Sequence, residues 1–300
     1  MVPLAAKPME TADLHLAPGD LPASITKLRF GITPYLAARQ LHVQMQPVAD
    51  EVGAALGIGI EVTVTQTYGE LVDAMARGTM DIALLSPLTY VLAKERQPDL
   101  QLLARTMTYG STDYSSYLAV RADSSLQGLS DLKGKRIAFV DPLSASGFLF
   151  PYVAILDGGL DPKKDFQHLE FSGTHPASLQ AVASGRVDAA AISSGTLTED
   201  QSGASAEVRI LFKAGRVPYD ALCARAGLSP AVIAKLSTVF QHIDTRSRRG
   251  REILGRATGI SAWIAAQDRD YDDVRAVLSR VRHHDPTILP LAHSATEAGR

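Results

Sequence analysis

Cysteine is almost missing from this chain: Cys223 is the only one among 300 residues. A single cysteine excludes an intrachain disulfide, and because no cysteine and histidine cluster surrounds it, the sequence predicts no metal site. No run of 18 apolar residues occurs, so no membrane-spanning helix is expected. Positive charge is not in excess either. With a net charge of −2, nothing in the sequence points to nucleic acid as a partner.

Catalytic motifs are also lacking. Ser144 and His175 are a serine and a histidine that could be a nucleophile and its base, but no motif supplies an orienting acid, and Gly-x-Ser-x-Gly is absent. We therefore expect a protein that is not an enzyme, with no catalytic residues and no cofactor.

The composition that remains is that of a globular protein with two lobes: 46% hydrophobic and 21% charged residues over 300 positions. Residues 1–27 contain four prolines but neither a basic segment nor a long apolar one, so they predict a flexible leader and not an intact secretory signal. From residue 28 onward, short apolar runs alternate with helical patterns. This alternation predicts an α/β fold with mainly parallel sheets flanked by helices.

Two segments of the chain repeat each other without a gap at a distance of 107 residues. Residues 70–86 lie over residues 177–193 and share alanine, glycine, aspartate and serine positions, including Gly78 with Gly185 and Asp81 with Asp188. The same offset lays the strand expected at 28–33 over that expected at 135–140. A second element in the same register favours two similar lobes.

The stretch Phe139–Phe148 joins a buried strand to an apolar helix through a loop of small hydroxyl residues that ends at Gly147. The first N–H groups of a helix have no partners in the helix, and its dipole favours an anion at that end. The loop therefore predicts an anion site to which Ser144 and Ser146 add hydroxyl donors. The alternative, that Ser144 is only a helix cap, stays open.

Ligands of parallel α/β sheets bind beyond the carboxyl ends of the strands. The repeat makes Tyr68 equivalent to His175, and Ser86 equivalent to Ser193, all at such ends. If the two lobes face each other, these four residues line one cleft together with the loop serines. Taken singly, each is also explained as a cap or a packing residue.

The chain from about residue 28 to 278 resembles the periplasmic phosphonate-, phosphite- and phosphate-binding proteins of ABC transporters. The resemblance rests on several motifs together: Gln66-Thr67-Tyr68, residues 78–83, residues 86–93, Tyr114-Ser115-Ser116, residues 129–135, residues 139–147 and Gly173-Thr174-His175. It implies the two-lobe, type II periplasmic binding fold, which closes on its ligand. It also implies that the oxyanion is bound by Tyr68, Tyr114, Ser144, Ala145, Ser146 and His175.

Two departures from the family pattern bear on the ligand. Ala145 stands where the family usually has threonine, which removes one hydroxyl donor. Members that bind aminoalkyl phosphonates resemble each other in an acidic residue near Gly195, and residues 192–196 contain none. The resemblance therefore implies a small or neutral-tailed oxyanion such as phosphite, methylphosphonate or phosphate.

The expected organisation is lobe 1 at residues 28–118 and 216–290, lobe 2 at 119–215, and a flexible tail at 291–300, with a hinge near Val120 and Gly215. The resemblance implies a monomer, an ABC permease as partner and a periplasmic location, although without a signal segment a cytoplasmic one stays open. The alternative function is an oxyanion sensor that feeds a receptor or regulator, including arsenite sensing through Cys223.

Overall fold

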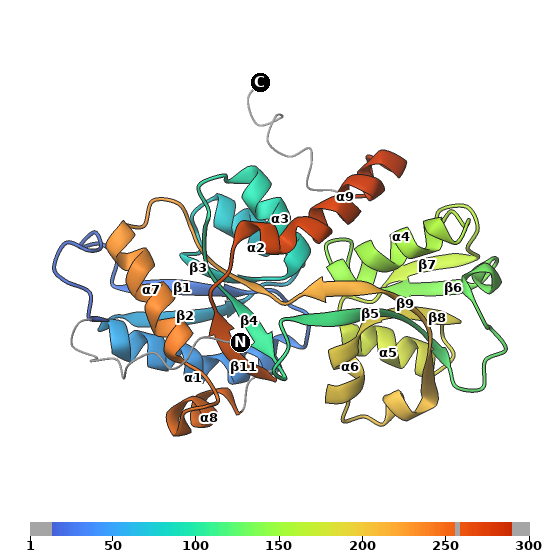
Figure 1. The fold of residues 1–300 in the computed structure, drawn as a ribbon, viewed down its shortest axis with the longest axis horizontal. Helices are drawn as coiled ribbons and strands as arrows, with labels where there is room; N and C mark the ends of the chain where they lie inside the picture. The colour runs from blue at the N-terminus through green and yellow to red at the C-terminus, as the bar shows by residue number, and fades with distance from the viewer. Residues whose placement is uncertain (1–13, 256–258, 290–300) are drawn as a thin grey trace.

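The computed structural model describes residues 14–255 and 259–289, and these form two α/β lobes side by side, each built on its own mixed sheet (Figure 1). The predicted α/β type II binding fold is therefore confirmed. Of the predicted flexible ends, residues 1–13 and 291–300 lie outside the described residues. The rest of the expected leader is not free: Leu14 is buried in the core of the first lobe, and Asp20 accepts a hydrogen bond from Lys235.

The first sheet has six strands in the order β11-β4-β10-β3-β1-β2. Strands β3, β1 and β2, which lie side by side with β2 at the edge of the sheet, run parallel. Strand β10 is antiparallel to both β3 and β4, and β11 is antiparallel to β4. The strand bounds are β1 (Lys27–Ile32), β2 (Gly59–Val64), β3 (Ile82–Leu85), β4 (Gln101–Thr108), β10 (Ala221–Ala224) and β11 (Ile260–Ile264).

The second sheet has five strands in the order β7-β6-β8-β5-β9. Strands β7, β6 and β8 are parallel, and the long strand β5 is antiparallel to both β8 and β9. The bounds are β5 (Asp113–Arg121), β6 (Arg136–Phe139), β7 (His168–Phe171), β8 (Ala189–Ser193) and β9 (Val208–Pro218).

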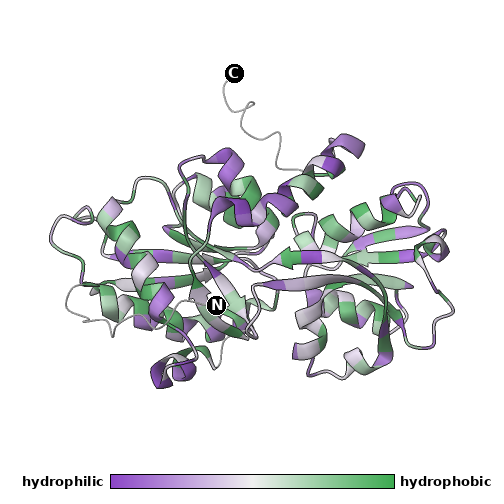
Figure 2. Cartoon of the chain, viewed as in Figure 1, coloured by the Kyte–Doolittle hydropathy of each residue, from purple (hydrophilic) through white to green (hydrophobic). Residues whose placement is uncertain are grey.

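Helices cover both sheets, and hydrophobic residues gather along the strands beneath them (Figure 2). In the first lobe the helices are α1 (Ala38–Leu56), α2 (Tyr68–Ala76), α3 (Pro87–Arg96), α7 (Pro230–His242) and α8 (Arg248–Leu254). In the second lobe they are α4 (Phe150–Asp157), α5 (His175–Ala183) and α6 (Ser194–Glu199), and α9 (Asp272–His284) follows near the end of the chain. Short turns of helix are η2 (Leu129–Leu132), η3 (Ala145–Leu149), η4 (Ala204–Glu207) and η5 (Asp268–Tyr271).

The internal repeat extends to individual ion pairs. In the first lobe, the guanidinium of Arg29 on β1 binds the Asp81 carboxylate, with Nε at 3.0 Å from Oδ2. In the second, Arg136 on β6 binds Asp188 in the same way, with Nη2 at 2.8 Å from Oδ1. Both arginines also donate to the carbonyl of the equivalent glycine at the end of the preceding helix. In both lobes, therefore, the same arginine–aspartate ion pair fixes the third parallel strand beside the first.

Strands β5 and β9 bear on where the chain crosses between the lobes. Val120 and Gly215, the expected hinge positions, both lie within these two paired strands. The apolar run at 118–120 is only the buried centre of a strand that begins at Asp113, so the boundary expected at residue 118 falls inside β5. Sheet membership favours crossings at 109–112 and 219–220, and we propose the lobe boundaries there.

Helix α9 contacts both lobes, packing on α3 of the first and on α4 of the second (Figure 1). Arg282 pairs with Glu95 on α3, and Arg280 pairs with Asp157 on α4. On α1, Val43 is 60% exposed, and the buried stripe runs from Leu41 through Met45. Within the described residues, every helix is too short or too polar to span a bilayer.

Candidate functional site

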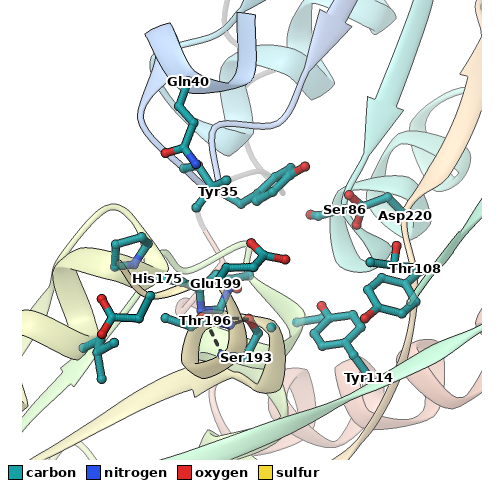
Figure 3. Close-up of a pocket in the computed structure, with 18 of the residues that line it drawn as sticks. Tyr35, Gln40, Ser86, Thr108, Tyr114, His175, Ser193, Thr196, Glu199 and Asp220 are labelled. Atoms are coloured by element: carbon teal, nitrogen blue, oxygen red, sulfur yellow. Dashed lines mark hydrogen bonds between the residues drawn. The ribbon is translucent and has the colours of Figure 1, made fainter. Parts of the chain in front are cut away.

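A cavity of about 420 Å³ lies between the two lobes, where the carboxyl ends of the parallel strands of both sheets meet (Figure 3). Seven of the eight predicted site residues line it: Tyr68, Ser86, Tyr114, Ser144, Ala145, His175 and Ser193. The eighth, Ser146, is fully buried behind the wall of the cavity. The structure thus brings together residues that are up to 125 positions apart in the sequence.

The loop after β6 has the geometry expected of an anion site. The helix begins at Ala145 with the π-helical turn η3 and continues without a break into α4. Gly147 is required here, because a Cβ atom at this position would lie 2.4 Å from the Val140 side chain. Its packing lets the N–H groups of Ala145 and Ser146 begin the helix beside the cavity, where a helix has no carbonyl of a preceding turn to bind them.

Ser144 proves to be a helix cap as well as a cavity residue. Its Oγ accepts the N–H of Gly147 at 3.0 Å, and Tyr68 from the other lobe lines the same cavity. Burial raises the pKa of Tyr68 well above its ordinary value, so the phenol keeps its proton and remains a donor. Ser144 can therefore be both a helix cap and an anion-site residue, because the capping hydrogen bond holds its oxygen at the start of the helix beside the cavity.

Tyr68 and His175 occupy equivalent positions, as the repeat predicts. Each is the first residue of its helix, α2 or α5, and each follows a threonine cap. The Thr67 hydroxyl accepts the N–H of Glu70, and the Thr174 hydroxyl accepts that of Ala177. Both aromatic side chains are buried, at 1% and 7% exposure, and both line the cavity.

The hydrogen bonds of His175 fix its tautomer. The backbone N–H of Ser193 donates to Nδ1 at 3.1 Å, so Nδ1 carries no proton and the neutral ring holds its proton on Nε2. Burial lowers the pKa of His175 to about 4. The ring is therefore neutral at physiological pH and offers one N–H donor at Nε2, which lies 3.5 Å from the Ser146 hydroxyl oxygen.

Ser146 and Tyr114 form the back of the same donor group. The Ser146 hydroxyl donates to the Tyr114 hydroxyl oxygen at 3.2 Å, and the Ser146 carbonyl accepts from Ser116 at 2.7 Å. Burial raises the pKa of Tyr114, so this phenol is also protonated. Ser146 consequently acts on the cavity through Tyr114 and His175.

Ser86 and Ser193 again form an equivalent pair. Each hydroxyl contacts the threonine three residues later, Thr89 at 2.9 Å and Thr196 at 2.8 Å. These contacts fix the start of α3 and α6. Ser193 also accepts the N–H of Thr196 and so caps α6, whereas the Ser86 side chain makes no such capping bond. Both serines lie on the cavity wall.

The sequence analysis missed the acidic residues of the cavity. Glu199, Asp200 and Asp220 line it, whereas the described residues around it include no lysine or arginine. Burial raises the pKa of Asp220 to about 7 and also raises that of Glu199. The position of Asp220 on the return crossing from lobe 2 to lobe 1 is the signal that could have identified it, because such crossings form the floor of the cleft.

Residues 192–196 contain no acidic residue, but the expectation that no carboxylate lies near Gly195 is wrong, because one from another position reaches it. A Cβ atom at Gly195 would lie 3.5 Å from Oε1 of Glu199, one helical turn later on α6. The carboxyl group also accepts a hydrogen bond from Tyr109 at 3.2 Å. An acid thus reaches this part of the cavity from another position.

Cys223 lies away from the cavity. It sits on β10 between β3 and β4 and is fully buried in the first sheet. Burial raises the pKa of its thiol far above the ordinary value. The cysteine is a core residue, which removes the basis for arsenite binding.

Comparisons with known proteins agree with this geometry. The family model of ABC-transporter phosphonate periplasmic substrate-binding proteins matches residues 30–271. The phosphate-import protein PhnD of Mycolicibacterium smegmatis is 28% identical over 284 residues, covering 86% of this chain and 88% of that protein. The phosphonates-binding periplasmic protein of Escherichia coli is 27% identical over 247 residues, covering 80% and 72%.

Solved structures show the same fold. A binding protein component of an ABC phosphonate transporter from Pseudomonas aeruginosa superposes with a TM-score of 0.79, at 22% identity over 87% of this chain and 88% of that one. PhnD1 of Prochlorococcus marinus, solved with methylphosphonate, has a TM-score of 0.76 at 19% identity over 86% and 98%. With the family model spanning most of its length, this chain belongs to the phosphonate-binding periplasmic substrate-binding proteins of ABC transporters.

Proposed function

We propose that this protein captures a small phosphorus oxyanion between its two lobes and delivers it to an ABC permease. The proposed ligands are phosphite, methylphosphonate and phosphate, and the location of Glu199 adds 2-aminoethylphosphonate to them. We further propose that the protein is a monomer in the periplasm, as expected for this family.

One observation carries the proposal: the start of the η3–α4 helix and three protonated donors from different elements converge on one cavity. The first-turn N–H groups of Ala145 and Ser146 supply the helix end. Tyr68 and Tyr114 are phenols with raised pKa values, and His175 is a neutral imidazole. Such a set binds an oxyanion through directed hydrogen bonds, in a cavity whose described lining has no lysine or arginine.

The family's aromatic and serine positions thus have defined roles in the proposed mechanism. The helix end and Ser144 hold the oxyanion on lobe 2, and Tyr68 reaches it from lobe 1. Because the donors come from both lobes, ligand binding favours the closed arrangement of the lobes. The closed form is then the one presented to the permease.

A thermal-shift screen tests the proposal. Phosphate, phosphite, methylphosphonate and 2-aminoethylphosphonate are compared with sulfate and arsenite at equal concentration. A ligand at 100 times its Kd stabilises the folded protein by about 2.7 kcal/mol. We expect at least one phosphorus oxyanion to raise the melting temperature, with arsenite inactive. A screen in which no phosphorus compound shifts the parent protein would refute the proposed function.

The sensor alternative is supported by one partial match. The tetrathionate sensor histidine kinase TtrS of Salmonella typhimurium is 30% identical over 108 residues, which covers 35% of this chain and 18% of that kinase. Crosslinking the ligand-loaded protein to its membrane-bound partner and identifying that partner distinguishes the two functions. A kinase or regulator in place of a permease would establish the sensor.

A further inference from the structure

We infer that α9 and residues 285–289 form a strap that spans both lobes behind the crossings and holds the cleft open until a ligand closes it. This inference rests on the proposed function, because it concerns how the same cleft closes on an oxyanion. None of the described strap residues lines the cavity. The strap therefore lowers the affinity of a site from outside it, through its contacts with lobe 2.

The strap is anchored on lobe 1. The turn η5 leads from β11 into α9, and Asp268 at its start accepts the Tyr90 hydroxyl of α3 at 2.6 Å. The rings of Tyr90 and Tyr271 lie 4.5 Å apart between their centroids. Farther along α9, Arg282 binds Glu95 of α3, with Nη2 at 2.8 Å from Oε2. These contacts make the strap move with lobe 1.

The far end of the strap rests on lobe 2. Arg280 pairs with Asp157 at the end of α4, and Lys163 pairs with Asp285, whose side chain is only 9% exposed. Between these two pairs, Val281 is fully buried. Helix α9 packs on η3 as well as on α4. The strap is thus seated on the same continuous helix that begins at the proposed anion site.

The two crossings lie between the strap and the cavity. In Figure 1, α9 lies on one side of strands β5 and β9, whereas α6 and β11, which contribute to the cavity wall, lie on the other. At the crossing itself, Tyr219 lines the cavity. Its carbonyl accepts the hydroxyl of Tyr271, a buried residue outside the cavity lining. The crossings therefore act as a pivot between the cavity and the strap.

Rotation of the lobes about such a pivot draws surfaces together on the cavity side and separates them on the other side. The cavity has a volume of about 420 Å³. The five heavy atoms of methylphosphonate fill at most about 150 Å³, because one water molecule occupies roughly 30 Å³ of the liquid. The structure therefore shows the cleft before full closure, with the strap seated on lobe 2.

Closure must then stretch or break the two ion pairs between the strap and lobe 2, so these pairs favour the open arrangement. A ligand that binds only the closed arrangement has an apparent affinity proportional to the closed fraction. One exposed ion pair changes an equilibrium constant by about 1.4- to 5-fold. Removal of both pairs should therefore tighten binding by about fivefold, although neither pair touches the ligand.

Calorimetry with methylphosphonate, phosphite and phosphate at low ionic strength tests the strap. The variants are Arg280→Ala, which removes one pair, and Lys163→Ala combined with Arg280→Ala, which removes both. We expect the double variant to bind about fivefold more tightly than the parent, with the single variant in between. Both should also unfold at a lower urea concentration than the parent. A change that merely loosened the site would instead lower affinity and stability together.

Arg282→Ala is the matched control, because it removes a similarly exposed arginine–carboxylate pair two residues away on α9, but within lobe 1. It should lose stability and keep the parent affinity. Ionic strength gives a second control. At about 1 M salt the Debye length falls to about 3 Å, so the exposed Arg280 pair is screened in the parent and the gain of Arg280→Ala should disappear.

Two results would overturn the inference. One is a folded double variant that binds no more tightly than the parent. The other is an equal gain of affinity in Arg282→Ala, which would show an effect of α9 stability and not of contacts between the lobes. A parent that binds none of the three oxyanions refutes the proposed function, and the inference with it, so the two failures are distinct.

Discussion

Replacing His175 by asparagine and by alanine separates the two hydrogen bonds of this ring. The Nδ1 atom accepts the Ser193 N–H, whereas Nε2 holds the proton that faces the donor group of the cavity. An asparagine oxygen takes nearly the place of Nδ1, so His175→Asn keeps the first contact and loses the second. Alanine loses both.

The expected losses in binding and in stability each correspond to one neutral hydrogen bond, the first at Nε2 and the second at Nδ1. Loss of the Nε2 donor should weaken oxyanion binding by about tenfold, which corresponds to about 1.4 kcal/mol. In His175→Ala the Ser193 N–H also loses its acceptor, which should lower the free energy of unfolding by a further 1 kcal/mol, roughly. His175→Asn should therefore unfold close to the parent while binding as weakly as the alanine variant.

The pH profile adds a test of the ring's charge. An unperturbed histidine would become protonated near pH 6.5, roughly, and strengthen anion binding below that pH. Because burial lowers the pKa of His175 to about 4, the ratio of parent to variant affinity should be the same at pH 6 and pH 8. Calorimetric titrations of the three proteins at both pH values provide the data. A ratio that grows tenfold at pH 6, or a His175→Asn variant that binds like the parent, would refute the assignment.

Four further predictions concern the acids and the cysteine. The pKa of Asp220 is raised to about 7, so between about pH 4 and 7 the folded protein keeps a proton that the unfolded chain has lost. Asp220→Asn should therefore raise the free energy of unfolding by about 1–3 kcal/mol at pH 8 and leave it unchanged at pH 4. Urea titration measures this difference. Asp81→Asn should cost about 3–5 kcal/mol, because a buried pair is broken, whereas Asp188→Asn, whose side chain is 30% exposed, should cost about 1 kcal/mol or less; equal losses would contradict the difference in burial. In Glu199→Gln, 2-aminoethylphosphonate should lose more affinity than methylphosphonate, and equal losses by calorimetry would show that its ammonium group does not reach this acid. Cys223 should react with a thiol reagent only at the rate of global unfolding, and rapid labelling of the native protein would show a more open first lobe.

The repeat is the reason that so much of the fold could be predicted from one sequence. The glycine and aspartate that recur between Gly78–Asp81 and Gly185–Asp188 have a physical cause, because both aspartates bind the arginine at the start of the neighbouring strand. A pattern fixed by hydrogen bonds inside each lobe is carried by the local sequence. The positions of Tyr68 and His175 at equivalent helix starts follow from it.

The crossings between the lobes could not be predicted in the same way. Residues 118–120 are apolar because they are the centre of β5, which pairs with strands on both sides. Hydrophobicity therefore marked the middle of the strand, while its beginning at Asp113 carries polar residues that face the cavity region. A strand that enters a sheet from a cleft has a polar end, and local hydrophobic patterns miss that end.

The acids were missed for a related reason, and they change the electrostatic character of the site. Sequence reading searched for a carboxylate at the position where relatives carry one, but a cavity is filled by whichever side chain reaches it. Glu199 arrives from the next turn of α6, and Asp220 from a crossing more than 70 residues after Ser144. An anion site whose described lining has no lysine or arginine must therefore hold its ligand by helix N–H groups and hydroxyl donors, against the charge of the acids that line the same cavity.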